Sequence, residues 1–163
     1  GESIILDASS TAVIAAKRLK EKERLTVITN SIEITAELFE KNDWNVMSTG
    51  GTVRQKSFAL VGTQTDRMLE CYHVDKAIVS CKGINENGEF SDSDELHAGN
   101  KRTMLKRATE KILAIDHTKF GKTAFSKIGM LSDVTMIVTD VKPEEKWIEI
   151  FSNEGIKCIY PQI

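Results

Sequence analysis

The chain has 163 residues, of which 40% are hydrophobic and 28% are charged, and its formal net charge is −2. This length and composition predict one soluble globular domain, and a charge so close to zero does not attract the phosphates of nucleic acid. The longest apolar runs, such as residues 112–115, are too short for a membrane span or a secretory signal, so we expect a cytoplasmic protein with no membrane partner.

Short β-type apolar runs alternate with amphipathic segments along the first half of the chain. Strands are expected at residues 3–6, 25–29 and 45–47, and helices at 11–21 and from Ser31 to about residue 40. The helical period disappears between residues 52 and 61, which predicts an irregular loop or a hairpin. This alternation indicates an α/β fold with a mainly parallel sheet flanked by helices.

The same alternation continues to the end of the chain. Helices are expected at 63–71, from Ser93 to about 108, and from Pro143 to about 151, since proline fits best at a helix start. Residues 83–90 are expected to form a loop with a turn at Asn87-Gly88. The remaining strands are expected at 76–80, 111–115, 136–139 and 157–160. With no repeat or linker, residues 1–163 are interpreted as a single domain.

Hydroxyl groups and glycines follow three successive predicted strands. Asp7-Ala8-Ser9-Ser10-Thr11 places hydroxyls and free backbone N–H groups at a helix N-terminus, which favours a phosphate. Thr29-Asn30-Ser31 and Thr49-Gly50-Gly51 repeat the arrangement. Each segment alone is an ordinary helix cap or turn. Because ligands of open parallel sheets bind where strands end, the three together indicate a binding site.

Charged residues near two further strand ends add to this pattern. Lys101 follows Ser93-Asp94-Glu95 on one predicted helix, Lys119 follows the strand that ends at Ile115, and Lys82 follows another strand. Lysine suits an anion and carboxylates suit sugar hydroxyls. The alternative is that these are solvated surface charges, and their spacing alone favours that alternative.

Motifs for catalysis, metal binding and cofactor binding are missing from the sequence. The cysteines Cys71, Cys81 and Cys158 form no C-x-x-C pair, and the histidines follow no i, i+4 pattern. The chain also lacks a phosphate-binding P-loop, a G-x-G-x-x-G loop and a G-x-S-x-G elbow. We therefore expect reduced thiols, no metal, no cofactor and no catalytic residue.

Six segments, in order, resemble signatures of the C-terminal domains of DeoR-family transcriptional repressors. They are residues 4–11, 25–31, 49–54 with 59–62, 75–77 leading to Gly83-Ile84, Glu95 followed by 101–104, and 116–121. The resemblance spans nearly the whole chain. It implies a sensor domain with a fold similar to ribose-5-phosphate isomerase, which binds a phosphorylated sugar or related metabolite.

In the intact repressors of this family a winged helix-turn-helix precedes the sensor. The resemblance therefore implies that such a head is missing from this chain, that DNA is bound only through it, and that the protein forms a homo-oligomer. The effector contacts implied by the matching positions, together with the lysine before Gly83, are Asp7, Ser9, Ser10, Thr11, Thr29, Asn30, Gly50, Gly51, Lys82, Gly83, Glu95, Lys101 and Lys119.

Two residues depart from the pattern of the related isomerases. Those enzymes carry acidic residues before and after the equivalent of Gly83-Ile84, where this chain has Lys82 and Asn85. Proton abstraction next to a carbonyl needs a positioned base, and neither residue is a good one. We therefore expect no isomerase activity and an effector more anionic than is usual for the family. The alternatives are a sugar-phosphate isomerase of the same fold and a protein-interaction domain. For the expected oligomer, the segment 52–61 with Phe58 and Leu60 would be either an exposed apolar contact or a loop packed on its own domain.

Overall fold

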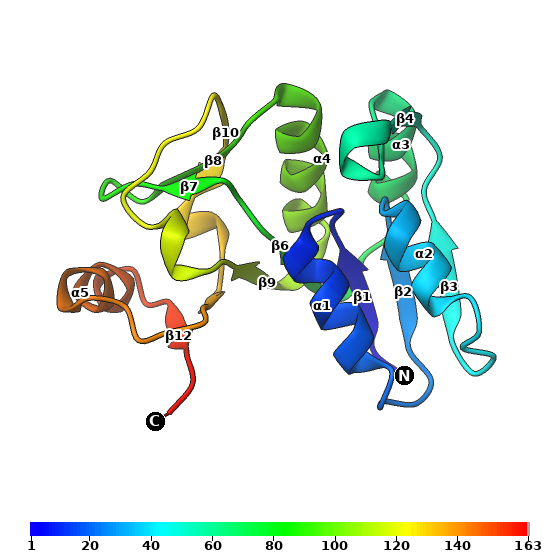
Figure 1. Ribbon diagram of the computed structural model, residues 1–163, viewed down its shortest axis with the longest axis horizontal. Coiled ribbons are helices and arrows are strands. Elements are labelled where there is room, and N and C mark those ends of the chain that lie inside the picture. Colours follow the sequence, from blue (N-terminus) through cyan, green and yellow to red (C-terminus); the bar gives the residue numbers. More distant parts are fainter. Residues whose placement is uncertain (163) are drawn as a thin grey trace.

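A seven-stranded parallel sheet forms the centre of the molecule in the computed structural model, which describes residues 1–162 (Figure 1). The strand order is β12-β11-β9-β6-β1-β2-β3, and every pairing within this sheet is parallel. The expected α/β fold with a mainly parallel sheet is therefore confirmed. The strands are β1 (Ser3–Leu6), β2 (Thr26–Thr29), β3 (Asn45–Ser48), β6 (Val74–Val79), β9 (Ala108–Ala114), β11 (Met136–Val138) and β12 (Lys157–Ile159).

Helices cover both faces of this sheet. Because successive strand residues point to opposite faces, Ile4 and Leu6 of β1 pack against α1 and α2, whereas Ile5 packs into the larger core on the other side. Met104 of α4 and Phe151 of α5 belong to that larger core. The helices are α1 (Ser10–Leu19), α2 (Ile32–Leu38), α3 (Thr63–Glu70), α4 (Glu95–Lys106) and α5 (Glu145–Asn153).

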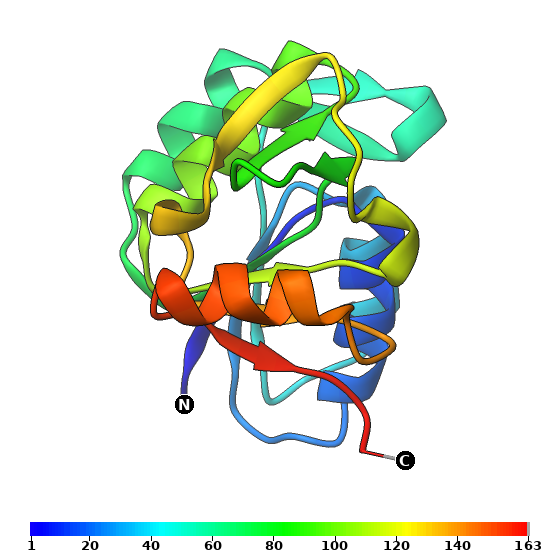
Figure 2. The same cartoon turned by 90° about the vertical axis from the view of Figure 1, so that its left-hand side faces the viewer.

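Two small antiparallel units lie at one end of the molecule, above the carboxyl ends of the main strands (Figure 2). The first is a hairpin of β4 (Thr52–Arg54) and β5 (Ala59–Val61), joined by a short 3₁₀ turn. Of the two forms expected for residues 52–61, the structure therefore shows the hairpin. The backbone of the hairpin forms hydrogen bonds with that of Asn30 and Ile32, so the hairpin packs on its own domain. The side chain of Phe58 nevertheless stays 59% exposed.

The second unit is a three-stranded sheet of β7 (Gly83–Ile84), β8 (Glu89–Asp92) and β10 (Ser126–Met130). The expectation of a loop over residues 83–90 is wrong, although the turn at Asn87-Gly88 is present, with Gly88 at φ 80°. The strand signal is weak because β8 is short and, beside Phe90, buries the polar residues Ser91 and Asp92.

Two helix starts differ from expectation. Helix α4 begins after Asp94, not at Ser93, because the Asp94 carboxylate accepts the amide of His97 at 3.0 Å and caps the helix. Pro143 lies buried before α5 and not inside it, since the next residue, Glu144, has an extended backbone with ψ 151°. Within residues 1–162 no helix has the length and apolar content needed to span a lipid bilayer.

Candidate functional site

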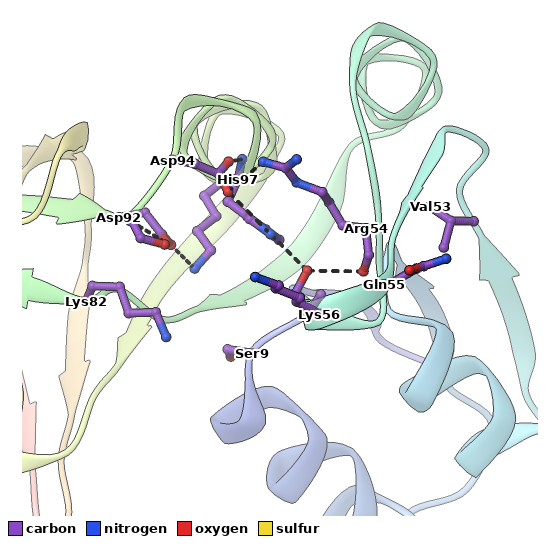
Figure 3. Close-up of a pocket in the computed structure, with 13 residues that line it drawn as sticks. Ser9, Val53, Arg54, Gln55, Lys56, Lys82, Asp92, Asp94 and His97 are labelled. Atoms are coloured by element: carbon purple, nitrogen blue, oxygen red, sulfur yellow. Dashed lines mark hydrogen bonds and ion pairs between the residues drawn. The ribbon is translucent and has the colours of Figure 1, made fainter.

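A cavity of about 740 Å³ opens between the start of α1, the β4–β5 hairpin and the start of α4 (Figure 3). Its volume is in the range of pockets that hold small molecules. It lies beyond the carboxyl ends of β1 and β6, where ligands of open parallel sheets bind. The lining residues are Ala8, Ser9, Val53, Arg54, Gln55, Lys56, Ser57, Lys82, Asp92, Ser93, Asp94, His97 and Lys101.

A buried ionic cluster forms one wall of this cavity. The Lys101 Nζ atom lies 2.6 Å from Asp92 Oδ2 and 3.3 Å from Asp7 Oδ2, and it donates to the carbonyl of Ser80 at 2.8 Å. Burial opposes the charge of Lys101, but the two carboxylates outweigh burial and raise its pKa. Burial likewise opposes the charge of Asp92, and Lys101 outweighs it, so the pKa of Asp92 is lowered. Lys101 and Asp92 are therefore both charged, and the positive charge of Lys101 is already balanced within the cluster.

The start of α1 forms the floor of the cavity. Asp7 accepts the amide of Ser9 at 3.0 Å and that of Ser80 at 2.8 Å, which fixes the loop after β1. Ser9 then caps the helix by accepting the amide of Ala12 at 3.1 Å. The amides of Ser10 and Thr11 are left without a partner among the described residues, as is usual in a first helical turn. This end of α1 therefore favours an anion.

Two side-chain contacts attach the hairpin to the start of α4. Arg54 Nη2 lies 3.1 Å from Asp94 Oδ2, and Ser57 Oγ lies 3.0 Å from His97 Nε2. Burial opposes the charge of Asp94, but the His97 amide and Arg54 together lower its pKa. Burial also lowers the pKa of His97, with Asp94 opposing the shift, so His97 is neutral at pH 7. Arg54, like Lys101, is a paired cation.

The two remaining cations of the lining are Lys56 and Lys82. Neither forms an ion pair within residues 1–162, and both are exposed. The ion pairs at the cavity contain two cations, Arg54 and Lys101. They also contain three carboxylates, Asp7, Asp92 and Asp94, so their summed charge is −1. Adding Lys56 and Lys82 gives a net charge of +1, which favours an anionic ligand.

The structure brings part of the residues expected from the sequence to this cavity. Ser9, Lys82 and Lys101 line it, and Asp7, Ser10 and Thr11 adjoin it at the start of α1. Lys119 is not a lining residue, and its Nζ atom lies 3.9 Å from Asp116 Oδ2. Burial raises the pKa of the Cys81 thiol to about 12, and both Lys101 and Lys119 oppose that shift.

Four other expected residues, Thr29, Asn30, Gly50 and Gly51, are not among the lining residues of the cavity. Thr29 Oγ1 donates to the Leu6 carbonyl at 2.8 Å, and Asn30 Nδ2 donates to the Leu60 carbonyl at 2.9 Å. The Gly50 carbonyl accepts Thr65 Oγ1 at 2.6 Å. Gly51 has φ 135°, and a Cβ there would lie 2.3 Å from Thr65 Oγ1. Asn30 and Gly51 therefore contact β5 of the hairpin, whereas Thr29 and Gly50 bond neighbouring segments.

Gly83 and Glu95 lie outside the lining of the cavity. A Cβ at Gly83 would lie 2.5 Å from the carbonyl oxygen of Lys122, so glycine allows a close approach of two backbones. The Glu95 carboxylate is 64% exposed and bonds Arg102 and Ser126 on the outer side of α4.

The sequence did not predict several lining residues, of which the most informative are Arg54, Lys56, Ser57, Asp92 and His97. One signal for the first three is present in the sequence. Arg54-Gln55-Lys56-Ser57 is a polar run between two β-type segments, which is typical of a hairpin tip. No local pattern identifies Asp92 or His97.

The fold has counterparts among solved structures. A ribose 5-phosphate isomerase A from Methanocaldococcus jannaschii superposes with a TM-score of 0.52 and 17% identity, over 74% of this chain and 47% of that one. RipA from Yersinia pestis superposes with a TM-score of 0.57 and 10% identity, over 95% of this chain and 45% of that one. The molecule is thus an α/β protein with a ribose-5-phosphate isomerase-like fold and a polar cavity at its strand ends.

Residues 1–141 match the family described as the DeoR C terminal sensor domain. The chain therefore belongs to the DeoR family of transcriptional regulators. This confirms the resemblance carried by the six sequence segments.

Curated relatives agree with this assignment. The HTH-type transcriptional regulator YulB of Bacillus subtilis is 41% identical over 96% of this chain. The L-fucose operon activator of Escherichia coli is 36% identical over 86% of it, and the glycerol-3-phosphate regulon repressor of the same organism is 24% identical over 96%. The chain covers 60%, 57% and 62% of these three relatives, so it spans about three fifths of their length.

Proposed function

We propose that this chain binds a phosphorylated sugar or a related metabolite in the cavity at the strand ends. In the full-length regulator, the bound effector controls DNA binding by an attached winged helix-turn-helix. The observation that carries the proposal is the pairing of anion-binding and hydroxyl-binding groups in one cavity. Lys56, Lys82 and the start of α1 suit a phosphate, and Asp92 and Ser57 suit sugar hydroxyls.

The names of two relatives support this class of effector. One relative is named for the glycerol-3-phosphate regulon and another for the L-fucose operon. Glycerol 3-phosphate and L-fucose both carry hydroxyl groups, and the first also carries a phosphate. These are the groups that the lining residues of the cavity suit.

We infer that the effector is sensed without being converted. An isomerase needs a free base beside its substrate. Asn85 Oδ1 accepts the amides of Asn87 and Glu89 at 3.1 Å, so this side chain serves the turn. The lining carboxylates, Asp92 and Asp94, are both held by cations. The same site therefore supports binding better than proton abstraction.

Control of DNA binding requires that the effector binds one arrangement of the regulator better than another. In this proposal the protein is a cytoplasmic homo-oligomer that contacts DNA only through its helix-turn-helix heads. The sensor domains of the subunits would set the spacing of those heads.

A thermal-shift panel tests the proposal. Phosphorylated sugars and polyols are compared with the same compounds lacking phosphate. At a ligand concentration of 100 times Kd, binding stabilises the domain by about 2.7 kcal/mol, which corresponds to a rise in Tm of roughly 5–10 °C. Shifts by phosphorylated compounds alone support the proposal. Equal shifts by the unphosphorylated compounds, or no shift across the panel, would refute it, and conversion of ribose 5-phosphate by the domain would favour the isomerase.

A further inference from the structure

Lys56 and Lys82 point toward one another across the cavity. Lys82 follows β6 and reaches in from the side of β7 and β8, whereas Lys56 reaches in from the tip of the β4–β5 hairpin (Figure 3). Ser9, at the start of α1, lies below the space between them. Three separate parts of the fold therefore direct anion-binding groups at one region.

The other cations of the lining do not contribute free charge to that region. Lys101 is held by Asp92 at 2.6 Å, and Arg54 is held by Asp94 at 3.1 Å. A ligand that used either cation would first have to separate an existing ion pair. Lys56 and Lys82 have no such competitor within the described part of the chain.

We propose that Lys56 and Lys82 together grip one phosphate group, and that this pair makes the cavity selective for a doubly charged phosphate ester over a singly charged anion of the same shape. The inference rests on the proposed function and adds the residues that set its selectivity. The phosphate would lie over the start of α1. The polyol would extend toward Ser57, Asp92 and His97.

The two unpaired ammonium groups of the lining, Lys56 and Lys82, together match the charge of one dianion. A phosphate ester carries between −1.5 and −2 charges at pH 7, with a second pKa of about 6. Such a group matches the two unpaired ammonium groups, whereas a sulfate ester, with one charge, leaves one of them unmatched. Because charge-assisted hydrogen bonds are the stronger kind, we expect the phosphate ester to bind about tenfold more tightly or better.

Two matched ligand pairs test this inference by isothermal titration calorimetry at pH 7.5. They are glucose 6-phosphate with glucose 6-sulfate, and glycerol 3-phosphate with glycerol 3-sulfate. The Lys56–Lys82 pair, called the clamp below, would bind the phosphate group itself and not the polyol. We therefore expect the phosphate ester to bind about tenfold more tightly than its sulfate ester in at least one of the two pairs. Phosphate and sulfate esters that bind equally, or no binding by either phosphate ester, would overturn the clamp.

Two substitutions assign the preference to the lysines. Lys56→Met and Lys82→Met keep the apolar length of the side chain and remove its charge. Each is expected to reduce the phosphate preference to about threefold or less. Lys106→Met, at the exposed far end of α4, is the matched control and should keep the wild-type preference. If only one of the two lysines affected the preference, the joint grip would be wrong.

The pH dependence provides a second readout. The preference should disappear at pH 5, because the phosphate ester is then mostly singly charged. The sulfate ester keeps one charge throughout, so its own pH dependence reports the titration of the protein. The sulfate ester therefore controls for every charged group around the ligand. These groups are Lys56, Arg54, Lys82, Asp92, Asp94, His97 and Lys101 of the lining, and Asp7, which pairs with Lys101.

Failure of this inference and failure of the proposed function give different results. A sugar phosphate that shifts the Tm but binds no better than its sulfate ester overturns the clamp and leaves the sensor proposal standing. A panel in which no phosphorylated compound binds overturns both.

Discussion

Replacing Lys101 by methionine should destabilise the domain strongly. The substitution leaves the carboxylates of Asp7 and Asp92 buried side by side, with relative exposures of 1% and 3%, and without the cation that now lies 3.3 and 2.6 Å from them. Removing one partner of a buried ion pair costs about 3–5 kcal/mol. For a domain of this size the change in Tm is roughly 2–4 °C per kcal/mol, so we expect a loss of roughly 6–20 °C.

Acid should reduce this difference. In the wild type the pKa of Asp92 is lowered because Lys101 outweighs the effect of burial. Its contribution to stability is present above the unfolded pKa of about 3.9 and is lost as the pH falls through the lower folded pKa. In Lys101→Met the unpaired Asp92 has a raised pKa, so its protonation between pH 7 and pH 4 relieves the variant, whereas the wild type still keeps most of this contribution at pH 4. The gap between the two proteins should therefore narrow as the pH falls from 7 to 4.

Urea unfolding followed by circular dichroism measures both effects, at pH 7 and at pH 4. The double variant Asp92→Asn with Lys101→Met removes one buried charge and should recover part of the loss at pH 7. A cost below about 1 kcal/mol for Lys101→Met, which is the range of exposed pairs, would show that the cluster is solvated and not buried.

Three further predictions concern the walls of the cavity. Gly51→Ala should cost about 1–3 kcal/mol and weaken effector binding, because φ is 135° and the new Cβ meets Thr65 Oγ1 at 2.3 Å; urea unfolding and calorimetry check this. Asp94→Asn should keep the helix cap but release Arg54, so effector affinity should rise while stability changes by less than about 1 kcal/mol, as the same two assays show. His97 should titrate below pH 6.5 by NMR, because burial disfavours its charged form; stability should fall as the pH drops below that value, since the unfolded chain binds the proton more readily.

Local signals in the sequence predicted the frame of the molecule well. Ser9 and Ser31 cap α1 and α2 as hydroxyl residues usually do, and the apolar runs gave the strands of the parallel sheet. The small sheet was missed because Ser91 and Asp92 do not resemble strand residues, and their burial depends on partners elsewhere. Asp92 is buried because it pairs with Lys101, which no local pattern reveals.

The site was harder to predict than the fold, and the reason lies in the two kinds of charge that it contains. A lysine in a sequence looks the same whether it is exposed, paired or aimed at a ligand. The structure separates Lys101, which two carboxylates neutralise, from Lys56 and Lys82, which have no such partner in the described residues. Only the tertiary arrangement brings the hairpin tip opposite the end of β6, so only it reveals that Lys56 and Lys82 face the same cavity.

This separation bears on how effector identity is encoded. The segments that resemble the family signatures supply the frame, such as the Asp7–Lys101 pair and the Gly51 turn. Many lining residues fall between those segments, including Lys56 and Lys82, and these are positions that a substitution can alter without breaking the frame. If the proposed function holds, the family signatures supply the frame of the binding site, and substitutions between them, such as those at Lys56 and Lys82, should change which anion the cavity prefers.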